Sequence, residues 1–219
     1  MTAEIEPVYQ EKGDSWPKIL KYNYERYGDT HTAMRHKHHG IWQPYSWKDY
    51  YLSAKHLALG LLSRGFEAGD KVLIIGDNAP QWYYTELAAQ ANHGAAVGVY
   101  SELLPSEVKY IAQNSEARFA VVQDQEQVDK LLEIIKELPR LKRVIYWNYK
   151  GLAHYDAPIL MGYEHVLELG IKYEAEHPRI FEQNIESGSA ADICALIYTS
   201  GTSGATPKGA VHSYRTMMA

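Results

Sequence analysis

The segment of this sequence best suited to chemistry is a loop rich in glycine and hydroxyl residues near residue 200. An apolar run over residues 193–198 leads directly into Thr199-Ser-Gly-Thr-Ser-Gly-Ala-Thr-Pro-Lys-Gly209. Glycines permit positive φ and let backbone N–H groups approach a ligand closely. Successive N–H groups in such turns form a concavity that binds anions. The glycines of this loop are Gly201, Gly204 and Gly209, and its side-chain donors are Thr199, Ser200, Thr202, Ser203 and Lys208. Together they predict a polyphosphate site.

The letters exclude three other well-known loops. No Gly-Lys-Ser/Thr occurs anywhere, so this is not a Walker A loop. No Gly-x-Gly-x-x-Gly follows a strand, so it is not a dinucleotide fingerprint. The loop also lacks the glycine two places beyond Ser203 that a nucleophile elbow needs. A flexible Gly/Ser-rich surface turn stays the alternative interpretation. A lysine after Thr-Ser-Gly-Thr-Ser-Gly, at the end of an apolar strand, favours phosphate.

Alternating strands and helices must position this loop. Short apolar runs predict strands at 72–75, 95–100, 119–122, 144–147 and 193–198. Helical patterns lie between them, beginning at Pro80 and covering 105–113, 128–138 and 163–169. This alternation predicts an α/β fold with a mostly parallel sheet and helices on both faces. The polar segment 179–192 is predicted to be a loop or linker before the last strand.

The first part of the chain has a different pattern. Residues 16–27 have helical spacing, and residues 32–36 and 41–45 flank His39-Gly40 as the strands of a small antiparallel hairpin. Ser46 and Asp49 have the spacing of a capping box that begins the next helix. We therefore divide the chain into an N-terminal arm, helix and hairpin (1–45), an α/β subdomain (46–178), and a linker, last strand and phosphate loop (179–219).

Composition narrows the classes of function. The net charge of the 219 residues is -5, which does not favour a nucleic-acid partner. A single cysteine, Cys194, allows no intrachain disulfide. The N-terminus carries acids where a signal peptide needs a basic start, and no apolar stretch approaches the ~20 residues of a transmembrane segment. These features predict a cytoplasmic protein.

The motif Tyr-Thr-Ser-Gly-Thr-Ser-Gly…Pro-Lys-Gly closely resembles the AMP-binding signature of the adenylate-forming superfamily. That superfamily contains acyl-CoA synthetases, luciferases and peptide-synthetase adenylation domains. Four longer stretches look like the bacterial long-chain fatty acyl-CoA synthetase branch: Asp77-Asn-Ala-Pro-Gln-Trp82, Gly98-Val-Tyr100, Gln113-Asn-Ser-Glu-Ala117 and Val122-Gln-Asp-Gln-Glu-Gln-Val-Asp-Lys-Leu-Leu132. The resemblance implies the front part of the large N-terminal domain of such an enzyme.

The resemblance also implies a reaction and its small-molecule substrates. ATP and a fatty acid, with Mg²⁺, give an acyl-adenylate and pyrophosphate, and the thiol of coenzyme A then displaces AMP. The residues that match the family's ATP-binding loop are Thr199, Ser200, Gly201, Thr202, Ser203, Gly204 and Lys208. Thr202 and Lys208 would act on the reacting phosphates, and no metal ligand is assigned. An enzyme of fatty substrates could also touch a membrane loosely, although no amphipathic basic helix indicates this.

Two departures from the family pattern qualify this assignment. Three residues, 205–207, precede Lys208 where the family usually has two, so the position of Lys208 is conditional. Tyr214 stands where the family often has histidine. The family's later parts, including its C-terminal domain, do not occur in these 219 residues, which predicts that this polypeptide alone is inactive. The alternative is a non-catalytic, truncated or decayed fragment that at most binds nucleotide. Acyl-chain preference and oligomeric state are not indicated.

The other candidate constellations have simpler interpretations. His31, His36, His38 and His39 are expected to be solvated hairpin residues, because a zinc site needs three or four convergent ligands. Cys194 is expected to be a buried, inert thiol, because no base lies at motif spacing. His212 and Ser213 are expected to be loop or helix-start residues.

Overall fold

The computed structural model describes residues 13–199 and 207–219. Its strands are β1 (Thr32–His38), β2 (Ile41–Ser46), β3 (Lys71–Ile75), β4 (Ala95–Val99), β5 (Phe119–Val122), β6 (Arg143–Tyr146), β7 (Leu160–Gly162), β8 (Ile193–Thr199) and β9 (Lys208–Ser213). Its helices are α2 (Trp16–Tyr27), α3 (Trp47–Ser63), α4 (Pro80–Ala91), α5 (Pro105–Ser115), α6 (Gln125–Ile134), η1 (Ile135–Glu137), α7 (Tyr163–Glu176), α8 (Ile180–Ser187) and α9 (Tyr214–Met217).

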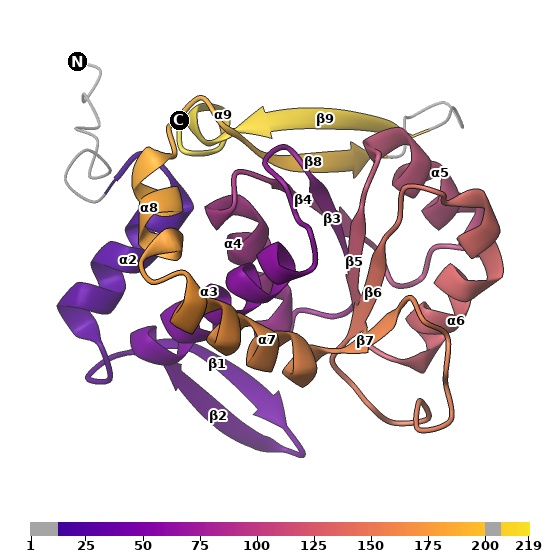
Figure 1. Cartoon of the computed structure of the whole chain (residues 1–219), viewed down its shortest axis with the longest axis horizontal. Helices are drawn as coiled ribbons and strands as arrows, with labels where there is room; N and C mark the ends of the chain where they lie inside the picture. Colours follow the sequence, from indigo (N-terminus) through magenta and orange to yellow (C-terminus); the bar gives the residue numbers. More distant parts are fainter. Residues whose placement is uncertain (1–12, 200–206) are drawn as a thin grey trace.

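A mixed sheet forms the centre of the molecule (Figure 1). Within the described residues its order is β7-β6-β5-β3-β4-β8-β9, and every neighbouring pair is parallel except β8 and β9. The carboxyl ends of β3, β4 and β8 therefore lie along one edge of the sheet, where open α/β folds bind their ligands.

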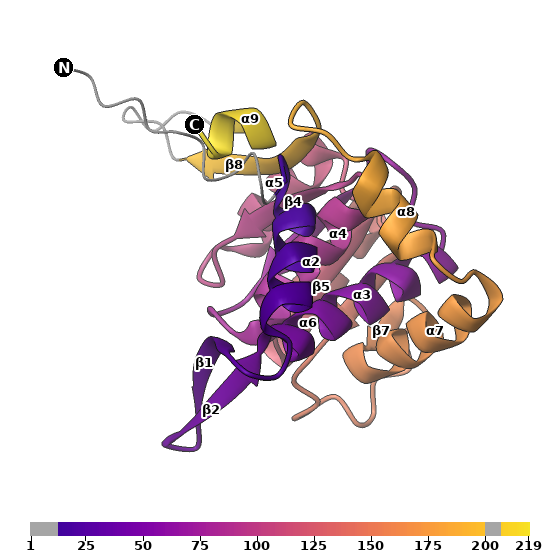
Figure 2. The same cartoon turned by 90° about the vertical axis from the view of Figure 1, so that its left-hand side faces the viewer.

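Helices cover both faces of this sheet because the central strands are apolar on both sides. Val72 and Ile74 of β3 pack in one core, together with residues of α2, α3, α4, α7 and α8. Leu73 and Ile75, which alternate with them, pack in a second core with residues of α5 and α6. Figure 2, turned by 90°, shows α3, α4, α7 and α8 together on the first face. The predicted fold class is confirmed.

The capping box and the hairpin predicted for the N-terminal part are also present. Ser46 caps α3: its Oγ accepts from the backbone N–H of Asp49 at 3.1 Å, and Asp49 Oδ2 accepts from the backbone N–H of Ser46 at 2.8 Å. The hairpin β1–β2 pairs antiparallel, with the register His38↔Ile41, around a turn in which His39 and Gly40 have φ of 47° and 79°.

The prediction for segment 179–192 was wrong in part. Residues Ile180–Ser187 form helix α8, whose Phe181 and Ile185 are almost fully buried against the first face of the sheet. These two buried side chains anchor a short helix. Most of its other residues are polar, so the sequence shows no clear helical periodicity of apolar residues. The short elements β7, β9 and α9 were also not predicted.

Candidate functional site

The two ends of the predicted phosphate loop lie opposite each other in a hairpin. Strands β8 and β9 pair antiparallel, and Thr199 is the direct partner of Lys208. Directly opposed residues of an antiparallel pair point to the same face, so these two side chains are neighbours. Both residues are exposed. The remaining predicted loop residues, Ser200, Gly201, Thr202, Ser203 and Gly204, lie outside the described residues.

Helix α5 holds both strands of this hairpin near the loop. The hydroxyl of Tyr198, in β8, donates to Asn114 Oδ1 at 2.7 Å. The hydroxyl of Tyr110 donates to the carbonyl of Pro207, just before β9, at 2.9 Å. Sequence reasoning missed these tyrosines. Asn114 falls within one of the family-like stretches, but no spacing rule connects it to a strand 84 residues away.

The role assigned to Gly209 needs correction. It was expected to supply positive φ, but it is paired within β9 opposite Tyr198 and is not among the glycines with positive φ. A Cβ atom at this position would lie 2.7 Å from the Tyr198 ring. The missing side chain therefore lets the ring lie across β9, which in turn directs the Tyr198 hydroxyl toward α5.

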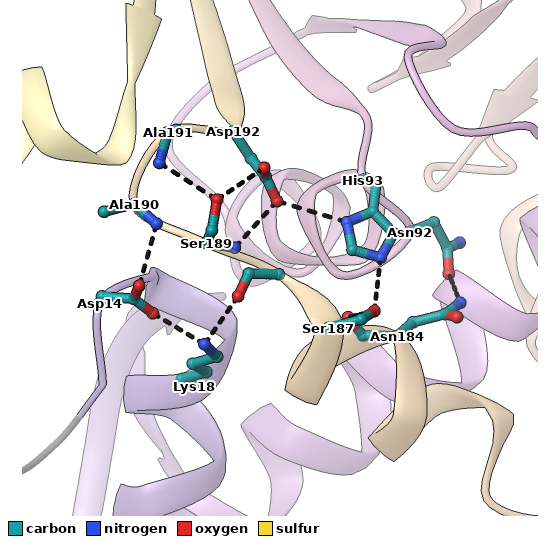
Figure 3. A network of polar contacts seen from close by, with 11 residues as sticks. Asp14, Lys18, Asn92, His93, Asn184, Ser187, Ser189, Ala190, Ala191 and Asp192 are labelled. Atoms are coloured by element: carbon teal, nitrogen blue, oxygen red, sulfur yellow. Dashed lines mark hydrogen bonds and ion pairs between the residues drawn. The ribbon is translucent and has the colours of Figure 1, made fainter.

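A polar network fixes the segment that leads into β8 (Figure 3). Asp192 accepts from the backbone N–H and the hydroxyl of Ser189, both at 3.0 Å, and from His93 at 3.4 Å. Lys18 of α2 donates to the carbonyl of Gly188 at 2.7 Å and to Asp14 at 2.8 Å. This lysine holds the pKa of Asp14 below its usual value.

Part of this network has the connectivity of a Ser-His-Asp triad. His93 Nε2 lies 3.1 Å from Ser187 Oγ, and His93 Nδ1 lies 3.4 Å from Asp192 Oδ2. The Ser187 hydroxyl also donates to the Asn184 carbonyl at 3.0 Å. The two N–H groups that follow Ser187 are used internally: Gly188 donates to Ile185 and Ser189 to Asp192. A catalytic triad works with free N–H donors that stabilise the oxyanion of its intermediate. Because both donors are occupied here, the three side chains position β8 and do not form a catalytic triad.

A cleft of about 510 Å³ lies at the carboxyl edge, between the loops that follow β3 and β4 and the strand β8. Its lining is Gly76, Asp77, Asn78, Trp82, Glu86, Ala96, Gly98, Val99, Tyr100, Ser101, Glu102, Ala195, Ile197, Tyr198 and Met217. The cleft therefore shares Tyr198 with the phosphate-loop hairpin. Asp77 and Trp82 belong to a family-like stretch, yet the sequence did not place them in a cleft.

Among the ionisable groups that line this cleft, Glu86 has the most strongly shifted pKa. Burial raises the pKa of its carboxyl to about 7, an effect that the hydrogen bond from Gln90 Nε2 at 3.3 Å opposes. The same Gln90 amide donates to the carbonyl of Cys194 in β8 at 3.2 Å. Helix α4 thereby connects the cleft carboxyl to the strand that carries the loop.

The predictions of a buried thiol at Cys194 and of a helix start at Ser213 are confirmed, whereas the prediction of a loop or helix start at His212 was wrong, because His212 pairs with Ala195 inside strand β9. Its thiol is fully buried, and burial raises the pKa of that thiol to about 11. A thiol with this pKa is neutral at physiological pH and a poor nucleophile. Ser213 is the N-cap of α9, and His212 lies in β9.

The histidines of the hairpin are spread over its surface. His31, His38 and His39 are exposed, and His36 is half-buried. No group of three or more His, Cys, Asp or Glu side chains that could hold a metal occurs in residues 13–199 and 207–219. In the same residues, none of the helices combines the length and apolarity required to cross a bilayer.

Comparison with known proteins places these features in a family. The family model described as AMP-binding enzyme matches residues 20–219. The chain is 32% identical over 209 residues to long-chain-fatty-acid–CoA ligase ACSBG1 of Bos taurus, covering 95% of this chain and 28% of that protein. It is 32% identical over 197 residues to long-chain-fatty-acid–CoA ligase ACSBG2 of Xenopus laevis, covering 90% and 26%. The chain thus spans about a quarter of the length of the curated relatives it matches.

A solved structure supports the same assignment at the level of fold. The anthranilate CoA ligase AuaEII, in complex with anthranoyl-AMP, superposes with a TM-score of 0.74 at 21% identity. The match covers 91% of this chain and 34% of that one. Because the family model matches nearly the whole chain, this protein belongs to the AMP-binding enzyme family.

Proposed function

We propose that this chain is the phosphate-holding part of an ATP-dependent ligase that activates a long-chain fatty acid as an acyl-adenylate and transfers the acyl group to coenzyme A. The observation that carries the proposal is the β8–β9 hairpin, which presents Thr199 beside Lys208 at the carboxyl edge of a parallel sheet. The match to two fatty-acid–CoA ligases supports the substrate class.

The proposed chemistry is positioning and charge stabilisation. The fatty carboxylate attacks the α-phosphorus of ATP, the bond to the bridging oxygen breaks, and pyrophosphate leaves. The hydroxyl and N–H groups of residues 199–204 would hold the β- and γ-phosphates, and Thr202 would act on the reacting phosphates. Lys208 would offset the charge that grows on the leaving pyrophosphate. In the second step the thiol of coenzyme A adds to the acyl carbon and AMP departs.

The family resemblance also implies Mg²⁺, which would share the phosphate charge when bound. The described residues contain no cluster of acidic or histidine side chains fitted to a metal. We assign no metal ligand among these residues. A cytoplasmic location and small-molecule partners (ATP, a fatty acid and coenzyme A) belong to the same proposal.

The 219 residues are proposed to bind ATP without completing the reaction, because they match only 28% of the Bos taurus ligase. The competing proposal is a non-catalytic product that at most binds nucleotide. An assay with ATP, Mg²⁺, palmitate and coenzyme A should yield no thioester from this chain. Thioester formation by the chain alone would overturn the first statement.

Calorimetric titration with ATP and Mg²⁺ tests the phosphate site directly. Lys208→Ala should weaken binding about ten-fold or more, because a charge-assisted hydrogen bond to phosphate contributes roughly 1.5–3 kcal/mol. Lys150→Ala is the matched control, since Lys150 is also exposed but lies in the loop after β6. Equal affinity of Lys208→Ala and the wild-type chain would remove Lys208 from the site, and no binding by the wild type would favour the competing proposal.

A further inference from the structure

The hairpin β1–β2 projects from the body of the molecule. Figures 1 and 2 both show it extending beyond the helices that cover the sheet. Its tip carries two large apolar side chains in water: Ile41 is 65% exposed and Trp42 is 61% exposed. The base of the hairpin is packed instead, because Met34 contacts the first core. The exposed side chains are thus confined to the end that points away from the fold.

The same hairpin is free of negative charge. Residues 30–48 contain no Asp or Glu, but they include Arg35, Lys37 and Lys48. The acids that flank the segment are already engaged, because Asp29 pairs with Lys48 at 2.9 Å and Asp49 caps α3. Arg35 and Lys37 are exposed, and neither side chain makes an ion pair with any residue that the structure describes.

The register places the cations and the tryptophan on one face. Lys37 is the direct partner of Trp42, and Arg35, two residues earlier in β1, is the partner of Pro44. Opposed residues share a face, as do residues two apart in a strand. Arg35, Lys37 and Trp42 therefore form one exposed surface, and Ile41 lies next to Trp42 at the tip, on the opposite face.

An aromatic ring beside unpaired cations suits the boundary between lipid and water. Tryptophan is favoured at the headgroup level of a bilayer, and Arg and Lys there meet lipid phosphates. We propose that the β1–β2 hairpin docks on an anionic lipid bilayer, with Trp42 and Ile41 entering the headgroup region and Arg35 and Lys37 facing the phosphates. This inference is independent of the ligase reaction proposed above.

Vesicle flotation tests the apolar half of this surface. The wild-type chain should float with vesicles of equal parts phosphatidylglycerol and phosphatidylcholine, and much less with phosphatidylcholine alone. The double variant Ile41→Ser/Trp42→Ser should lose at least ten-fold in partition coefficient. The control Tyr100→Ser removes an aromatic side chain that is 75% exposed but follows β4, outside the hairpin, and it should bind as the wild type does.

Charge reversal tests the other half. Arg35→Glu/Lys37→Glu should lower the partition coefficient at least ten-fold, because each basic residue near an anionic surface contributes about 1 kcal/mol, roughly five-fold. The control Lys136→Glu/Lys150→Glu changes the net charge equally at exposed positions elsewhere, and it should retain most of the binding. Circular dichroism melts of all variants report folding.

Three results would overturn the proposal. One is wild-type partitioning that ignores lipid charge, and another is an equal loss in the hairpin and control variants. The third is a wild-type chain that binds no vesicles but is retained on polyglutamate or duplex DNA through Arg35 and Lys37. That outcome would assign the hairpin to an acidic macromolecule.

Discussion

The two ends of strand β8 are held in different ways. Before Ile193, three side chains converge on residues 188–192: Lys18 of α2, Asp14 just before α2, and His93 in the turn between α4 and β4. The backbone N–H groups of Tyr214 and Arg215 donate to the carbonyls of Asp192 and Ala190, at 3.2 and 2.8 Å. Beyond Ile197, two tyrosine hydroxyls connect the hairpin to α5. Within the described residues, the start of β8 is held by several side-chain and backbone bonds, whereas its loop end is held by the pairing with β9 and by two tyrosine hydroxyls.

This difference suits a strand that presents a ligand loop. A fixed start sets the position of the strand in the sheet, and the bonds from α5 set the position of the residues on either side of the loop. Disturbing the start should then affect stability more than ATP affinity. Disturbing the end should do the reverse.

The largest effect is expected for Asp192→Ala. The substitution leaves the backbone N–H and hydroxyl of Ser189 and the ring of His93 without their acceptor, which should cost about 2–3 kcal/mol in unfolding free energy. Urea denaturation measures this loss. Asp156→Ala, at an exposed acid in the loop before β7, is the control and should change stability little. An unchanged midpoint for Asp192→Ala would show that the start of β8 is held otherwise.

Glu86→Gln should have the next largest effect, and it should depend on pH. The folded pKa of about 7 exceeds the ordinary value of 4.5, so the unfolded chain releases this proton first. The wild type should therefore lose stability relative to the variant as pH rises from 4.5 to 7. Above pH 7 the difference should stay constant at about 2 kcal/mol, a figure reduced for partial exposure to the cleft.

Denaturation of both proteins at pH 4, 5.5, 7 and 8.5 measures that difference. Subtracting one curve from the other removes the other titrating groups. The amide oxygen that the substitution introduces can still accept from Gln90, so the link from α4 to the Cys194 carbonyl should survive. A pH-independent difference would contradict the raised pKa.

Gly209→Ala should disturb the loop end. The new Cβ would lie 2.7 Å from the Tyr198 ring, which would have to shift and would lose its bond to Asn114. We expect a cost of about 1–2 kcal/mol and a several-fold loss of ATP affinity by calorimetry. Gly188→Ala is the control, because a Cβ there meets its nearest neighbour at an ordinary 3.4 Å. A larger loss of ATP affinity in Gly188→Ala than in Gly209→Ala would show that the start of β8, and not its loop end, controls ATP binding.

Much of the fold could be predicted because its signals are local. The apolar strand β3 and the capping box at Ser46 depend on neighbours in sequence and appear as predicted. Helix α8 was missed because its stability comes from burying Phe181 and Ile185 against distant elements. The pairing of β9 with β8 was missed because the strand is largely exposed and its sequence has no alternating pattern.

The same distinction between local and tertiary signals applies to the candidate site. The loop letters predicted a phosphate site from composition alone, and the structure adds that Thr199 and Lys208 face each other. The sequence could not predict the roles of Tyr110, Asn114 and Glu86, because each of them contacts residues that are distant in sequence and come close only in the folded protein. Periodicity in the sequence predicts the elements of the fold, whereas the residues that support the site are identified only by tertiary contacts.

Tyr198→Phe should have the smallest effect on stability and is the sharpest test of the loop end. It removes one hydroxyl and its 2.7 Å bond to Asn114, at a cost of about 0.5–1 kcal/mol. Tyr155→Phe removes a 2.7 Å bond to Asp129 and a 2.9 Å bond from Gln125, both outside the β8–β9 hairpin, and should cost at least as much. Only Tyr198→Phe should weaken ATP binding, by about three- to five-fold, because its hydroxyl holds the strand next to Thr199. Equal ATP affinity in the two variants would mean that the bond from Tyr198 to α5 does not affect ATP binding.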